Sequence, residues 1–122
     1  MSNSISWFEI PVTDFDRAKR FYEAVLGINI ETLNMGPDTM GMFSTDPNVV
    51  SGAIVYNTDA TPSKQGVTIY LNGGDDLAPL LARVVPAGGT VLVPKTEIGS
   101  DFGFFAHFVD TEGNKIGLHA MA

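Results

Sequence analysis

One helical pattern occurs twice in this chain, about half its length apart. Asp14 begins the first pattern and Gly27 ends it, with apolar residues recurring at helical spacing between them. Asp76 and Gly89 bound a second stretch of the same length, 62 positions later in a chain of 122 residues. This offset indicates an internal duplication. Since one unit of this size could not bury a sheet alone, we expect two units that share a core.

Strand patterns surround both helical stretches. Residues 4–12 alternate between two faces, as a strand does. Further strand patterns lie at 28–34, 38–44, 49–56, 66–72, about 90–95, 102–109 and 115–120. The order is β-α-β-β-β twice, which predicts an α+β fold. We expect a single domain over 1–122, with repeat 1 at about 1–57, a polar linker at about 58–65 and repeat 2 at about 66–122.

Composition narrows the classes of function. The chain has 14 acidic and 7 basic side chains, a net charge of -7, which disfavours nucleic acid and anionic membrane surfaces. The absence of cysteine excludes disulfides, thiolate zinc sites and cysteine nucleophiles. No apolar run approaches the roughly 20 residues of a membrane helix, and the start, MSNSISWFEI, lacks a signal-peptide pattern. We expect a cytoplasmic protein whose partner is a neutral or cationic small molecule.

Three segments together resemble a known family. They are WFEIPVTDFDRAKRFYEAVLG at 7–27, the glycine pair at 88–89, and FFAHFVDTEGNKIGLH at 104–119. They are similar to the vicinal oxygen chelate superfamily, which contains glyoxalase I, extradiol dioxygenases and bleomycin-resistance proteins. The resemblance covers essentially the whole chain. It implies paired β-α-β-β-β modules that form an open, U-shaped barrel around a site, and a homodimer in which each site takes strands from both subunits.

The resemblance also locates the superfamily's metal ligands, which are His, Gln or Glu on four strands. The first position falls on Trp7, the last on Gly117, and the start of the second repeat offers Val67 or Thr68. The fourth falls within 49–56, which contains no His, Asp or Glu. Such side chains cannot hold a divalent cation. We therefore expect the usual metal site to be missing and no cofactor to be bound.

Three other ionisable residues are predicted to face the same cavity. Strand alternation places Glu9 on the face of Trp7, and His119 on the face of Gly117. By resemblance to members with a tyrosine three residues before the aspartate of the final motif, His107 faces the cavity too. Glu9, His107 and His119 are therefore the candidate catalytic residues. They could form an acid–base set, hold a divalent metal such as iron(II) or zinc, or simply be wall residues.

Apolar and hydroxyl side chains complete the expected cavity wall. The candidate ligand-binding residues are Trp7, Met40, Met42, Thr68, Tyr70 and Phe105. Three interpretations stay open. The chain is a metal-free binding protein of the bleomycin-resistance kind, or a glyoxalase-like lyase, isomerase or dioxygenase using Glu9, His107 and His119, or a partner-binding subunit without its own chemistry.

Overall fold

Two four-stranded sheets of the same topology make up the structure, a computed structural model that describes residues 3–99 and 101–122. The first sheet has the order β1-β4-β3-β2, formed by β1 (Trp7–Pro11), β2 (Glu31–Met35), β3 (Asp38–Met42) and β4 (Ser51–Tyr56). The second has the order β5-β8-β7-β6, formed by β5 (Tyr70–Asn72), β6 (Thr90–Gly99), β7 (Gly103–Val109) and β8 (Lys115–Ala120). β1 pairs in parallel with β4, and β5 pairs in parallel with β8, whereas the other strand pairs are antiparallel. The repeated β-α-β-β-β order and the α+β class are thus confirmed.

Helix α1 (Phe15–Leu26) forms where its end signals predict it. The Asp14 carboxylate accepts a hydrogen bond from the Arg17 backbone N–H at 3.1 Å, satisfying a donor that the first turn leaves unpaired. Gly27 ends the helix in the left-handed conformation, at φ 68°, which a glycine adopts without strain. The buried positions Ala18, Phe21, Tyr22 and Val25 follow helical spacing.

Helix α2 (Ala78–Ala82) is much shorter than the stretch from Asp76 to Gly89 that the sequence predicts. Pro86 explains the difference. It has no backbone N–H to donate and it disfavours the helical conformation for the residue before it. Residues 83–88 form turns instead, and none of the helical residues of α2 is buried.

Among the strands, β5 and β6 differ most from the sequence prediction. The pattern at 66–72 contributes only three residues to β5, and Val67 is 93 % exposed, so alternation there does not reflect a buried face. In the second sheet, β6 continues to Gly99 rather than ending near position 95. Ser100, in the predicted turn that follows, lies outside the described residues.

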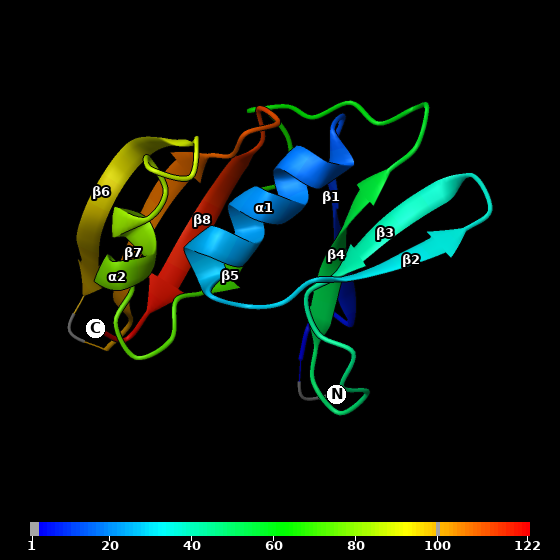
Figure 1. Cartoon of the computed structure of the whole chain (residues 1–122). Helices are drawn as coiled ribbons and strands as arrows, with labels where there is room; N and C mark the ends of the chain where they lie inside the picture. Colours follow the sequence, from blue (N-terminus) through cyan, green and yellow to red (C-terminus); the bar gives the residue numbers. More distant parts are fainter. Residues whose placement is uncertain (1–2, 100) are drawn as a thin grey trace.

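Helix α1 packs against residues of both sheets. Figure 1 shows α1 lying between β8 and β4. The Phe21 ring packs against Phe108 of β7 at 5.8 Å, and one continuous apolar core joins α1 to residues of both sheets. The buried Tyr22 hydroxyl donates to the Asp110 carboxylate at 2.6 Å, which ties α1 to the end of the second sheet.

The turn between β7 and β8 also holds the start of α1. Glu112 Oε1 accepts hydrogen bonds from the backbone N–H groups of Thr13 and Asp14, at 2.9 and 2.8 Å. Glu112 Oε2 pairs with the Arg17 guanidinium at 2.7 Å and accepts from the Thr111 hydroxyl at 3.0 Å. Burial alone would raise the pKa of Glu112, but these hydrogen bonds outweigh it and lower the pKa to about 2. We call this group the Glu112 clamp.

Candidate functional site

The faces of both sheets that point away from α1 form the candidate site, and we call this surface the open face. Strand alternation assigns it, because Ile10 and Ile54 of the first sheet and Ile116 and Leu118 of the second are buried on the α1 side. The residues between them in sequence, such as Glu9 on β1, therefore lie on the open face. Within residues 3–99 and 101–122, no helix is long and apolar enough to cross a membrane.

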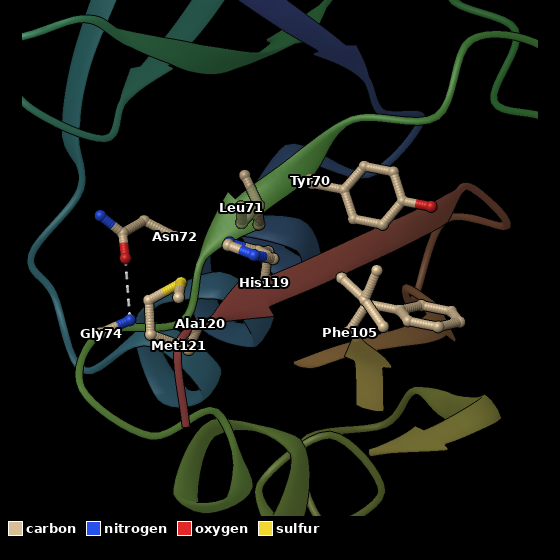
Figure 2. A pocket seen from close by; sticks show the side chains of 9 residues that line it. Tyr70, Leu71, Asn72, Gly74, Phe105, His119, Ala120 and Met121 are labelled. Carbon is tan, nitrogen blue, oxygen red and sulfur yellow. Dashed lines mark hydrogen bonds between the residues drawn. The ribbon is translucent and has the colours of Figure 1, made fainter. Parts of the chain in front are cut away.

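A cavity of about 730 Å³ opens over β5 and β8, and we call it the β5–β8 cavity. Figure 2 shows Tyr70, His119 and Phe105, from three different strands, around the same space. The lining residues are Tyr70, Leu71, Asn72, Gly74, Ile98, Phe105, His119, Ala120 and Met121. Aromatic and aliphatic walls with a few polar groups are typical of a small-molecule site.

A second hollow of about 740 Å³ lies between β1 and the segment that leads into β5, and we call it the intersheet groove. Its lining residues are Ile5, Trp7, Phe8, Glu9, Leu26, Ile28, Phe43, Val50, Ser51, Val67, Thr68, Ile69, Tyr70, Leu71 and Asn72. Within this apolar lining, Glu9 Oε2 accepts a hydrogen bond from the indole N–H of Trp7 at 3.3 Å. Because Tyr70 lines both hollows, they adjoin at this side chain.

Tyr70 and His107 meet over Gly117. Both residues are register partners of Gly117, Tyr70 from β5 and His107 from β7, so they flank β8 from opposite sides. The Tyr70 hydroxyl lies 2.8 Å from His107 Nε2, within hydrogen-bond distance. A β-carbon at position 117 would lie only 2.6 Å from Tyr70 Cε2, so the ring needs glycine beneath it.

The surroundings of His107 disfavour its protonated form. Burial lowers the pKa of His107 below its ordinary 6.5, and the positive charge of Lys115 lowers it further. The Phe105 ring packs against the imidazole at 5.2 Å, edge to face. The neutral form of His107 therefore predominates at neutral pH.

His119 has a separate partner. Its Nε2 lies 2.7 Å from the carbonyl oxygen of Phe102, and since a carbonyl can only accept, His119 donates from Nε2. In a neutral imidazole this leaves Nδ1 as the acceptor. Glu9, His107 and His119 thus share the open face but each has its own hydrogen-bond partner. No three His, Asp or Glu side chains in the described part of the chain are grouped so as to hold a metal ion.

Of the remaining predicted residues, some line one of the two hollows and the two methionines line neither. Trp7 and Thr68 line the intersheet groove, and Phe105 lines the β5–β8 cavity. Met40 and Met42 lie on the open face of β3, opposite Val55 and Ala53 of β4, and line neither hollow.

Sequence reasoning missed the meeting of Tyr70 with His107 and six of the nine cavity residues, which are Leu71, Asn72, Gly74, Ile98, Ala120 and Met121. The glycine at 117, in an otherwise bulky strand pattern, is the signal that could have indicated a close approach.

Comparison with known proteins defines the class. Residues 4–118 match the Glyoxalase/Bleomycin resistance protein/Dioxygenase superfamily, and the chain belongs to this family. A "Glyoxylase-like domain-containing protein" from Didymella fabae is 31 % identical over 118 residues, covering 93 % of this chain and 91 % of that protein.

Solved structures share the fold. A glyoxalase I variant from Zea mays superimposes with a TM-score of 0.75 at 22 % identity, covering 94 % of this chain. This chain spans only 45 % of the maize chain. A glyoxalase/bleomycin resistance protein from Albidiferax ferrireducens matches with a TM-score of 0.67 at 20 % identity, over 97 % of this chain and 98 % of that one. At such identities the likeness concerns the fold alone.

Proposed function

We propose that the protein binds a small, partly apolar, neutral or cationic molecule on its open face, without the superfamily's usual metal site. The observation that carries the proposal is the intersheet groove, where apolar side chains surround one carboxylate, Glu9, oriented by Trp7. An apolar wall with one placed charge suits binding of a small molecule. The indole face beside a carboxylate suits an organic cation in particular.

The donor set at the expected metal positions supports the metal-free part of the proposal. The indole nitrogen of Trp7 carries its hydrogen and donates it to Glu9. Gly117 offers no side chain, and the Tyr70 ring covers it. Val67 or Thr68 and the residues of β4 provide no imidazole or carboxylate. These residues do not fit a divalent metal.

A ligand screen tests the binding function. Trp7 is the only tryptophan and is 39 % exposed in the groove, so its fluorescence reports on occupancy. We expect some members of a library of aromatic neutral molecules and organic cations to change this fluorescence and raise the melting temperature. Absence of any response across the library would refute the function.

A matched pair of variants tests the role of Glu9. Glu9→Gln should weaken binding of cations about two- to fivefold, since the groove is open to water, and leave neutral ligands unaffected. Glu97→Gln, an exposed glutamate on β6, serves as the control and should change neither. Equal loss for cationic and neutral ligands in Glu9→Gln would show that the charge plays no part.

The alternative is a glyoxalase-like enzyme, a lyase, isomerase or dioxygenase, that uses Glu9, His107 and His119 with or without a divalent metal. The presence of both histidines on the open face, each with a defined hydrogen-bond partner, favours it. Elemental analysis of protein purified without chelator separates the metal-dependent version. Less than about a tenth of an equivalent of any transition metal would count against that version.

We further propose a homodimer, supported by the charges of the open face. In the first sheet this face carries the carboxylates of Glu9, Glu31 and Asp38, and in the second it carries the ammonium group of Lys115. The first sheet of one copy can therefore face the second sheet of another with opposite charges across the interface. Light scattering after size exclusion should give about twice the chain mass of 13.0 kDa, and a mass of one chain at all concentrations would contradict the dimer.

A further inference from the structure

We propose that the β5–β8 cavity binds an aromatic molecule through a hydroxyl group, which the Tyr70–His107 pair and His119 recognise as a hydrogen-bond donor. The inference rests on the proposed function only in requiring that the open face binds a small molecule. It adds the site, the ligand class and the atoms that select it.

The first step is the direction of the Tyr70–His107 hydrogen bond. A phenol is a stronger proton donor than a neutral imidazole N–H, and an imidazole nitrogen is a stronger acceptor than a phenol oxygen. At 2.8 Å the Tyr70 hydroxyl therefore donates to His107 Nε2. Having used its hydrogen, the Tyr70 oxygen has only lone pairs left for a further partner. The Tyr70 side chain, half exposed, is accessible to a ligand.

The second step is that His119 presents the same kind of group. Its Nε2–H is engaged by the Phe102 carbonyl at 2.7 Å, so in the neutral imidazole Nδ1 is the nitrogen left to accept a hydrogen bond. His119 lines the same cavity as Tyr70. Two acceptors on neighbouring strands select a ligand with a hydrogen to donate.

The lining of the cavity favours a hydroxyl group over an ammonium group on the ligand. Among the residues that the structure describes, no carboxylate lines this cavity, so a cation would find no counter-charge. The side-chain oxygen of Asn72, Oδ1, accepts a hydrogen bond from the Gly74 backbone N–H at 2.8 Å, which leaves the side-chain NH₂ group of Asn72 as a donor. A hydroxyl group, which donates and accepts, satisfies both kinds of partner. The aromatic part of the ligand would lie against Phe105, Ile98 and Met121.

Gly117 makes the arrangement possible. The Tyr70 ring lies directly on this residue, and a β-carbon would come within 2.9 Å even of Tyr70 Cγ, close to the backbone, where the ring cannot bend aside. An alanine at 117 would therefore force Tyr70 into another rotamer and separate it from His107. The position that the superfamily uses for a metal ligand thus serves here to seat a hydrogen-bonding pair.

The test uses two probes of the same shape, 2-naphthol and 2-methoxynaphthalene, which differ in the ability to donate a hydrogen bond. Calorimetry on the unmodified protein should show about five- to tenfold tighter binding of the naphthol. Tyr70→Phe and Gly117→Ala should reduce this ratio to about twofold or less while the ether still binds. Tyr56→Phe, a tyrosine on the α1 side of the first sheet, is the matched control and should keep the full ratio.

Equal affinity for both probes would overturn this inference and leave the proposed function standing, because an aromatic ligand would still bind. Binding of neither probe up to about 1 mM would overturn it as well, and the proposed function would then depend on the library screen alone.

Nitrogen NMR of the two histidine rings tests the hydrogen-bond directions without any ligand. We expect His107 to be unprotonated at Nε2 and His119 to be protonated there. A His107 ring protonated at Nε2 above its titration midpoint would refute the assigned direction.

Discussion

Replacing Glu112 with glutamine should lower the free energy of unfolding by about 2 kcal/mol at neutral pH. The Glu112 side chain is fully buried beside Arg17, and its carboxylate joins the turn after β7 to the first turn of α1. The pKa falls from 4.5 to about 2, which corresponds to at most about 3 kcal/mol of stabilisation of the charged form, and because the Arg17 side chain is 45 % exposed, screening by water reduces this to about 2 kcal/mol. Glutamine keeps the shape but lacks the charge that the guanidinium and the helix N-terminus stabilise.

The stabilisation that Glu112 provides depends on pH, because only its charged form is stabilised. The pKa of Glu112 is lower in the folded protein than in the unfolded chain, so its contribution is complete above about pH 4.5 and is lost as the pH falls towards about 2. The difference between the unmodified protein and Glu112→Gln should therefore be constant from pH 7 to about pH 5 and shrink below that range.

Urea denaturation followed by far-ultraviolet circular dichroism measures the free energy of unfolding at each pH. At pH 7 the melting temperature of Glu112→Gln should also fall by about 7 °C. Glu97→Gln, exposed on β6, controls for the loss of one charge. A loss below about 1 kcal/mol at pH 7, or a difference that stays constant down to pH 2, would refute the argument.

Three further predictions concern other contacts. Tyr22→Phe removes the hydroxyl that the buried Asp110 carboxylate accepts from, and should lower the free energy of unfolding by about 1–3 kcal/mol in the same urea assay; an unchanged value would contradict it. In a proton NMR titration His107 should titrate below pH 6.5, and Lys115→Met should raise the midpoint, whereas no rise would remove Lys115 as a cause. Gly103→Ala should destabilise by more than about 1 kcal/mol, because Gly103 has φ 78° and its β-carbon would lie 2.8 Å from the α-carbon of Met121, just after β8; a neutral effect in thermal melts would show that the backbone adjusts.

Local signals made most of the fold predictable. The cap at Asp14 and the terminating Gly27 act within a few residues of where they stand, so the bounds of α1 follow from the sequence. The second copy has matching end residues, but Pro86 interrupts the helix between them. The prediction relied on the two end residues and not on the proline between them, so it made this helix longer than α2 is.

The site was predictable in its faces but not in its contacts. Alternation along a strand says which side a residue lies on, and the structure has Glu9, His107 and His119 on the open face. Which residues meet depends on strand order and register. The pairing of β5 with β8 brings Tyr70 to His107 rather than bringing Glu9 to either histidine, and no local pattern encodes it.

The Glu112 clamp has a consequence for the order in which the chain can fold during synthesis. Its hydrogen bonds to Thr13 and Arg17 join positions 99 and 95 residues apart, nearly the whole chain. Helix α1 can form early with its Asp14 cap, but the clamp cannot close until Glu112 has left the ribosome. Until then the apolar face of α1 also lacks its core partners in β8, such as Ile116 and Leu118, so the nascent chain carries an unfinished core.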